Sequence, residues 1–105
     1  MMPVLFERET VLEAVFAEVA AERRRQVVLY GDQSGRPLRD WTGILGEEFG
    51  ELCEAICETT MDNARHPERG GRKNILREAC HVAAVAVQLM EIVIGEMQTP
   101  KEGPG

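Results

Sequence analysis

The chain has 105 residues and a formal net charge of -6, with 44% hydrophobic and 5% aromatic residues. This length predicts one domain, and the charge argues against general electrostatic binding to nucleic acid polymers or anionic lipid. A core of Val, Leu, Ile and Ala with few aromatic residues favours packed helices over a β-sandwich. An acidic site can still bind a nucleotide through divalent cations that bridge to its phosphates.

The cysteines and the apolar runs indicate a cytoplasmic protein. Cys53, Cys57 and Cys80 are odd in number and lie in helical patterns, so we interpret them as reduced thiols of the apolar core. A zinc site that joins them to His81 is an alternative, but no metal-ligand spacing motif supports it. The N-terminus carries no run typical of a signal peptide, and the longest apolar run, residues 82–87, is too short to cross a membrane.

A first helix is predicted from about Glu7 to about Tyr30. Its apolar residues recur at intervals of three and four and form one stripe. These residues are Val11, Leu12, Val15, Phe16, Val19 and Ala20. Three consecutive arginines, residues 23–25, follow in the C-terminal half, where a solvated cationic surface is the simplest interpretation.

Two glycines and a proline in residues 31–40 predict a loop, and Asp40 is the predicted N-cap of the second helix. This helix covers roughly residues 41–61. Glu48 falls within its apolar stripe, and Glu51 lies three residues on, on nearly the same face. The apolar members of the stripe are Ile44, Leu45, Leu52, Ala55 and Ile56.

A second loop, residues 62–71, precedes the third helix, which is predicted over residues 72–97. Within it, residues 82–87 are apolar on every side, which is typical of a helix that is buried all round. Since three helices of this length cannot easily bury one of their number completely, we expect a subunit interface, most simply in a symmetric dimer. Residues 99–105 should form a disordered tail.

The predicted fold is one all-α domain, residues 1–98, with three main helices. The last two should form a central antiparallel hairpin, because helices joined by a short loop normally pack antiparallel. On dimerisation this hairpin would form a four-helix bundle. One register of the hairpin pairs Glu48 with His81 and Glu51 with Glu78, which brings all four groups to one level.

Three carboxylates at one level would repel unless protonation, basic partners or a divalent cation compensates their charge. Oxygen ligands with open water positions suit Mg²⁺ or Mn²⁺. Acidic pairs at this spacing are usually only solvated. A purely structural dimerisation module, with Glu48 and Glu78 paired to arginines, therefore remains an alternative.

The two acidic segments resemble a known family signature. Residues 47–51 read Glu-Glu-Phe-Gly-Glu and residues 78–81 read Glu-Ala-Cys-His. The MazG-like all-α nucleoside triphosphate pyrophosphohydrolases have two adjacent glutamates, a third three residues on, and a later Glu-x-x-Asp. The resemblance covers roughly residues 41–94. His81 departs from it, and imidazole is a good ligand for Mn²⁺ or Zn²⁺ but a poor one for Mg²⁺.

The resemblance implies a metal-dependent hydrolase that converts a nucleoside triphosphate to the monophosphate and pyrophosphate, as a homodimer or homotetramer. Mg²⁺ or Mn²⁺ would be the cofactor. The implied metal ligands are Glu48, Glu51 and Glu78, with His81 as a ligand of a softer ion or a partner of a metal-bound water. The alternative for His81 is a core histidine whose hydrogen bonds are satisfied within the protein.

Glu47 would orient or deprotonate the attacking water, or simply face solvent. Further candidate substrate contacts are Arg72, Lys73, Arg77 and Trp41, of which Trp41 stacks on a base or packs where the second helix begins. The functional alternative, based on His81, is a catalytically impaired homologue. It would bind nucleotide or metal, or serve as an oligomerisation module.

Overall fold

The computed structural model describes residues 5–98, with side chains described from residue 9 onward. The helices are α1 (Leu5–Tyr30), α2 (Asp40–Thr60), the 3-10 helix η1 (Pro67–Arg69) and α3 (Arg72–Gln98), and this range contains no strand. The all-α prediction with three main helices is confirmed, and each boundary lies close to its predicted place. The predicted disordered tail lies outside the described residues.

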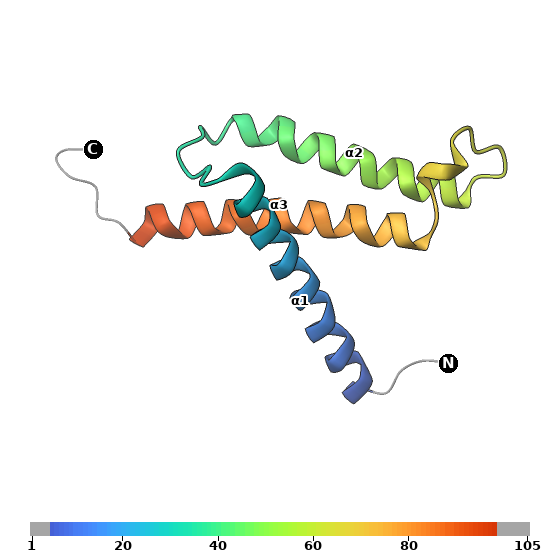
Figure 1. Ribbon diagram of the computed structural model, residues 1–105, viewed down its shortest axis with the longest axis horizontal. Coiled ribbons are helices and arrows are strands. Elements are labelled where there is room, and N and C mark those ends of the chain that lie inside the picture. Colours follow the sequence, from blue (N-terminus) through green and yellow to red (C-terminus); the bar gives the residue numbers. More distant parts are fainter. Residues whose placement is uncertain (1–4, 99–105) are drawn as a thin grey trace.

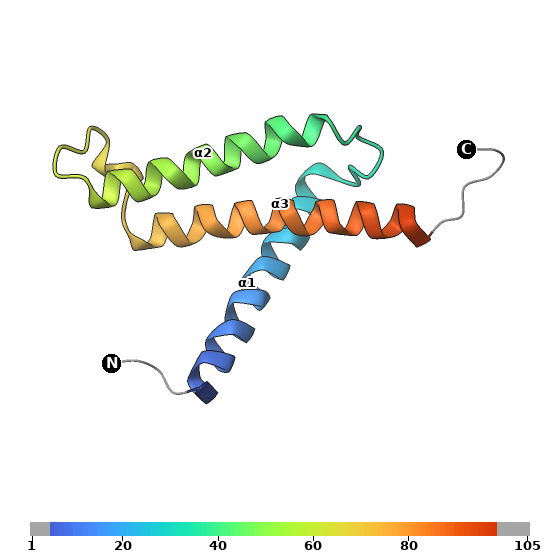
Figure 2. The ribbon, with the colours of Figure 1, turned by 180° about the vertical axis from the view of Figure 1, so that it is seen from behind.

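Helices α2 and α3 form the predicted antiparallel hairpin, and α1 crosses α3 and then extends away from it (Figures 1 and 2). The extents are 58 × 38 × 24 Å, and the radius of gyration is 17.3 Å. A compact domain of this length has a radius of gyration of about 13 Å. The single chain is therefore extended. The C-terminal half of α1 packs against the hairpin.

The loop between α2 and α3 depends on Gly70. A Cβ atom at this residue would lie 2.9 Å from the carbonyl carbon and oxygen of Glu58. Gly71 donates a backbone hydrogen bond of 2.7 Å to Oγ1 of Thr59, and His66 donates one of 3.0 Å to Oε2 of Glu58. The loop thus satisfies polar groups at the C-terminal end of α2, and it can approach that end because residue 70 has no side chain.

The core lies between the start of α2 and the C-terminal half of α3. Trp41, Val85 and Ile92 form a buried cluster. Ile44, Leu45 and Leu89 pack against it. Trp41 is only 2% exposed, so its expected packing where α2 begins is confirmed. The cluster fixes the end of the hairpin where α1 joins α2.

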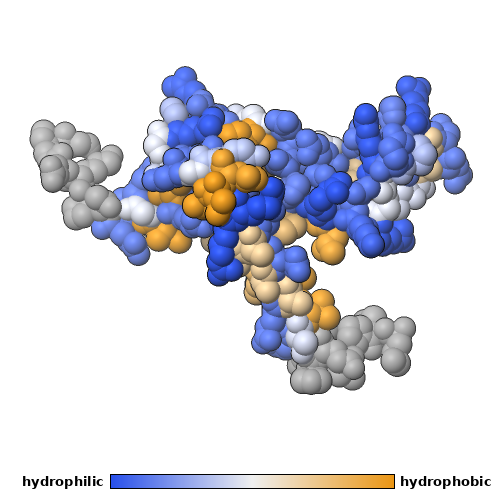
Figure 3. Space-filling model, in the orientation of Figure 1, coloured by the Kyte–Doolittle hydropathy of each residue, from blue (hydrophilic) through white to orange (hydrophobic). Residues whose placement is uncertain are grey.

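Much apolar surface is left uncovered in the single chain. The α1 stripe is exposed at Val11, Leu12, Val15 and Phe16, and Phe16 is 62% exposed. Figure 3 shows apolar side chains along α1 where it leaves the hairpin. On α3, Ala86 is exposed, so residues 82–87 are not buried all round by this chain. The chain exposes 8283 Å², whereas a compact monomer of this mass exposes about 5900 Å².

Two local expectations were wrong. Asp40 is not the N-cap of α2, because Arg39 precedes it with helical angles (φ -59°, ψ -30°) and the Asp40 N–H already bonds to the carbonyl of Pro37. An N-cap needs an extended backbone, so Asp40 lies within the first turn instead. Cys53 and Cys57, interpreted as core thiols, are exposed, and Cys80 is half-buried.

Helix α3 is long and apolar enough to cross a membrane by length and composition alone. The central helix of a small helical protein has the same properties, because it is apolar on several sides.

Candidate metal centre

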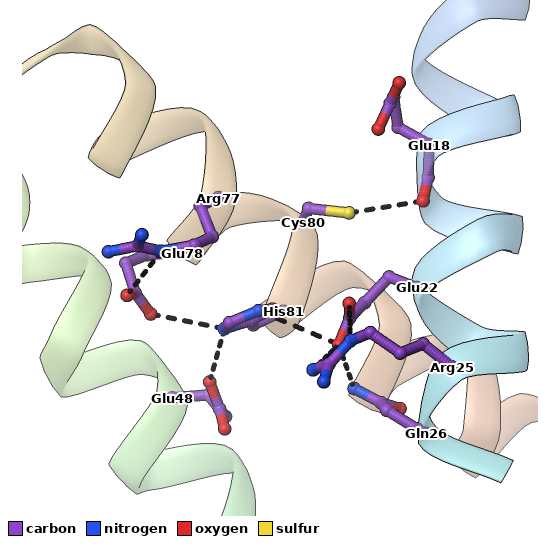
Figure 4. Close-up of polar contacts among 9 residues, drawn as sticks. All are labelled: Glu18, Glu22, Arg25, Gln26, Glu48, Arg77, Glu78, Cys80 and His81. Atoms are coloured by element: carbon purple, nitrogen blue, oxygen red, sulfur yellow. Dashed lines mark hydrogen bonds and ion pairs between the residues drawn. The ribbon is translucent and has the colours of Figure 1, made fainter. Parts of the chain in front are cut away.

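Glu48, Glu78 and His81 form a group that could hold a metal ion, with one ligand atom of each within 4.8 Å of the others. Helix α2 supplies Glu48, whereas α3 supplies Glu78 and His81, which share one face of that helix. His81 Nδ1 lies 3.4 Å from Oε2 of Glu78 and 3.6 Å from Oε2 of Glu48 (Figure 4). Glu48 thus lies opposite His81, as the predicted hairpin register requires.

The distances are longer than good hydrogen bonds but suit the edges of a coordination polyhedron. Oε2 of Glu48 and Oε2 of Glu78 are both buried and have no hydrogen-bond partner. Buried carboxylate oxygens normally find a partner, because an unpaired one costs free energy. Ligand atoms placed tetrahedrally about 2.1 Å from an ion lie about 3.4 Å apart. The donor atoms and the two distances from His81 Nδ1 therefore fit a divalent ion, and all three ligand atoms lie within 4.8 Å of one another.

The charge of the group is only partly compensated. Burial is the main reason that the pKa of Glu48 is raised, and the charges of Glu78, Glu47 and Glu22 raise it further. His81 opposes this effect. A divalent cation would remove the repulsion by favouring the charged form of each carboxylate.

Glu51 and Glu47 lie beside this group. The pKa of Glu51 is raised, first by burial, then by the charge of Glu48 and by contact with the Glu78 carboxyl. The charge of Glu47 adds to the raised pKa of both Glu48 and Glu51, although Glu47 itself is exposed to solvent. The group that could hold a metal ion therefore contains Glu48, Glu78 and His81 but not Glu51, which is exposed, as is Glu47.

A carboxylate from α1, Glu22, faces the other side of the His81 ring. Its Oε2 lies 3.7 Å from His81 Nε2. Arg25 donates two hydrogen bonds of 2.7 Å to the two Glu22 oxygens, and Gln26 Nε2 donates one of 3.2 Å to Oε2. The Arg25 bond is the main reason that the pKa of Glu22 is lowered although the side chain is mostly buried.

A cavity of about 350 Å³ lies between α1 and α3 on the Glu22 side of the ring. Its cationic lining residues are Arg25, Lys73 and Arg77. Lys73 and Arg77, both predicted substrate contacts, therefore lie near the metal group. Arg77 also pairs with Glu78 at 3.6 Å. Arg72, the first residue of α3, is exposed.

A second cavity, of about 320 Å³, is lined by Tyr30 of α1 and by Trp41 and Glu48 of α2. The Trp41 indole Nε1 is buried without a hydrogen-bond partner. The same holds for Oε1 of Gln26, whose Nε2 is committed to Glu22. Both residues line this cavity together with Tyr30, and a cavity with aromatic and amide side chains suits a nucleobase.

Sequence reasoning missed Glu22 and Gln26. Both continue the α1 stripe, since Val15, Val19, Glu22 and Gln26 follow one another at intervals of four, three and four residues. A polar residue in line with an apolar stripe was the signal that identified Glu48, and the same signal was present here. The zinc alternative loses support, because the group found among the described residues contains no cysteine.

Comparisons of the chain with protein-family models, with curated proteins and with solved structures give no significant match.

Proposed function

We propose that the protein is a metal-dependent nucleoside triphosphate pyrophosphohydrolase of the MazG-like type, acting in the cytoplasm on an NTP or dNTP. The observation that carries the proposal is the group of Glu48, Glu78 and His81, whose buried carboxylate oxygens lack hydrogen-bond partners at metal-ligand spacing. When bound there, Mg²⁺ or Mn²⁺ would polarise the phosphates and lower the pKa of an attacking water.

The two cavities support a nucleotide that spans the metal group. In this arrangement the base occupies the cavity that contains Trp41 and Tyr30 and is bordered by Glu48. The phosphates then lie at the carboxylates, where Lys73 and Arg77 of the other cavity neutralise their charge. Glu51, which is exposed and whose carboxyl contacts that of Glu78, is the proposed further ligand.

Glu47 is the proposed group that orients or deprotonates water. It follows Gly46 on α2 and is exposed, so solvent reaches its carboxylate. It is also next to Glu48 in the chain, and it is close enough to raise the pKa of both Glu48 and Glu51. A base at the solvent edge of a metal group can accept a proton without giving up a ligand role.

The chain is proposed to act as a homodimer or a larger homo-oligomer. The supporting observation is its surface of 8283 Å², which exceeds the value for a compact monomer by an area on the order of that buried by obligate dimers. The exposed α1 stripe and the exposed side of α3 are the surfaces that a second copy would cover, which would place two hairpins in a four-helix bundle.

The test is pyrophosphate release from the common NTPs and dNTPs, measured separately with Mg²⁺ and with Mn²⁺. We expect release that disappears in Glu51→Gln and Glu48→Gln. Glu54→Gln is a matched control on the same helix, because Glu54 pairs with Arg69 at 3.1 Å, away from the metal group. It should leave release unchanged.

Absence of release with every metal and triphosphate would contradict the proposal. Retained metal or nucleotide binding in calorimetry would then identify a catalytically impaired homologue. If neither the unaltered protein nor Glu48→Gln binds metal or nucleotide, the protein is a structural oligomerisation module.

A further inference from the structure

We propose that Glu22 is a positioning residue that turns His81 into a ligand for an imidazole-binding divalent ion such as Mn²⁺, Fe²⁺ or Zn²⁺. The proposal rests on the metal-dependent function above and goes beyond it, because it adds a residue from a third helix and names the class of ion. It is based on how the two nitrogens of one ring face different carboxylates.

The two His81 nitrogens have separate surroundings. Nδ1 faces Oε2 of Glu48 and Oε2 of Glu78, at 3.6 and 3.4 Å, and so belongs to the metal group. Nε2 faces Oε2 of Glu22 at 3.7 Å, on the opposite side of the ring (Figure 4). A neutral imidazole has one N–H and one lone pair, and a ligand atom needs the lone pair. When an ion is held by Glu48 and Glu78, a carboxylate beside Nε2 favours the tautomer with its proton there and leaves the Nδ1 lone pair for the ion.

Glu22 is held in a fixed orientation for this role. Both of its oxygens accept hydrogen bonds of 2.7 Å from Arg25, and Gln26 adds a bond of 3.2 Å. Its side chain is 11% exposed, whereas that of Arg25 is 51% exposed. A carboxylate that served only to pair with a surface arginine would not need this degree of burial. Its placement toward the ring gives it a second partner.

The arrangement favours ions that accept nitrogen. Two carboxylates and an imidazole form a mixed oxygen and nitrogen donor set, which suits Mn²⁺, Fe²⁺ and Zn²⁺ better than Mg²⁺. A carboxylate that accepts the other N–H of a ligating histidine raises the basicity of the ring. Glu22 and His81 would thus act together as the part of the site that selects the ion.

The experiment measures Mn²⁺ affinity and Mn²⁺–nitrogen coupling by electron paramagnetic resonance. The unaltered protein should bind Mn²⁺ with a ¹⁴N coupling, and His81→Asp should abolish the coupling and shift the preference towards Mg²⁺. Glu22→Gln should weaken Mn²⁺ binding about 10- to 100-fold. Glu18→Gln is the matched control, because Glu18 lies on the same helix and its carboxylate points away from His81 (Figure 4). It should leave affinity unchanged.

The decisive comparison places Glu22→Gln in the His81→Asp background. There it should have no effect on Mn²⁺ affinity, because Glu22 acts through the imidazole. An equal loss in both backgrounds, or the absence of ¹⁴N coupling in the unaltered protein, would overturn the proposal. Arg25→Gln gives a second test that keeps the Glu22 carboxylate but releases its orientation, and it should weaken Mn²⁺ binding in the same direction.

The measurements separate this proposal from the hydrolase function. Mn²⁺ binding that depends on Glu22, without pyrophosphate release from any triphosphate, would contradict the proposed function and support the role of Glu22. Pyrophosphate release, together with a Mn²⁺ affinity that is the same in Glu22→Gln as in the unaltered protein, would support the proposed function and contradict the role of Glu22.

Discussion

At the level of single residues, the position of Glu48 lowers the stability of the fold but suits a carboxylate that binds a metal ion. Its Oε2 is buried without a hydrogen-bond partner, and burial raises its pKa. The charged form is therefore less stable in the folded chain than in the unfolded chain. Residues of this kind are common where function is placed at the expense of stability.

We expect Glu48→Gln to raise the free energy of unfolding of the metal-free protein at pH 7 by about 0.5 to 1.5 kcal/mol. Because the folded-state pKa of Glu48 is raised above 4.5, its ionisation costs stability as the pH rises between the unfolded and the folded value. The gain in the free energy of unfolding of Glu48→Gln should be complete above the folded-state pKa of Glu48 and should vanish below its unfolded-state pKa. Chemical denaturation at pH 4 and pH 7 measures both.

Glu54→Gln is the control, since it removes an exposed ion pair and should lower stability by at most about 1 kcal/mol. Saturating Mn²⁺ should reverse the order, because an ion that binds only the folded state stabilises the unaltered protein and not the variant. A loss of stability in metal-free Glu48→Gln at pH 7 would show that the carboxylate has a favourable partner.

Trp41 combines a core position with a free polar atom. Its ring packs with Val85 and Ile92, while its Nε1 has no partner and it lines the second cavity. As it is the chain's single tryptophan, its emission reports directly on that cavity. We expect nucleosides without phosphate to change the emission in the absence of metal, whereas inorganic pyrophosphate should not.

Gln26→Leu should weaken nucleoside binding about 5- to 10-fold, because it removes the amide of a residue that lines the cavity, and a lost hydrogen bond costs about 1 kcal/mol. Gln33→Leu, a change of the same kind at a residue that also lines the cavity but carries no buried unpartnered atom, should have less effect. Emission that does not respond to any nucleoside would remove the cavity from the proposed substrate site.

At the level of the elements, the α2–α3 hairpin depends on the close approach of its loop to the end of α2. Gly70→Ala should lower the free energy of unfolding by about 1 to 3 kcal/mol, since a Cβ would lie 2.9 Å from the Glu58 backbone. Gly35→Ala is the control in the α1–α2 loop, where a Cβ meets no atom within 4 Å and should cost little. Urea denaturation of both variants checks this, and equal stability would mean that the loop shifts freely.

The order of the helices in the chain explains which contacts the sequence could predict. Helices α2 and α3 follow one another in the chain and pack antiparallel, so facing residues follow from simple counting, and Glu48 and His81 were matched in this way. The loop that follows α1, residues 31–39, leads to α2 and not to α3. Helices α1 and α3 are therefore not neighbours in the chain, and no count relates Glu22 to His81. Glu22 also stands before three arginines, a pattern that indicates a solvated surface. Its role depends on tertiary packing that periodicity does not contain.

At the level of the whole molecule, the extended chain predicts self-association. We expect sedimentation to show a dimer or a larger homo-oligomer. Phe16→Glu, at a side chain that is 62% exposed in the single chain, should shift the distribution towards monomer, because a charge would be buried in the interface. Glu13→Gln on the same helix should not. A monomer at all micromolar concentrations would contradict the proposed oligomer.

Because Glu22 lies on α1, ion binding should depend on the concentration of the protein itself. Glu22 contacts a ring of the hairpin from a helix whose other half is uncovered. Any partner copy that fixes α1 also fixes the carboxylate behind His81. Self-association and ion binding are then thermodynamically linked, and each must strengthen the other by the same factor. A rise in protein concentration would by itself raise the affinity of each subunit for its ion.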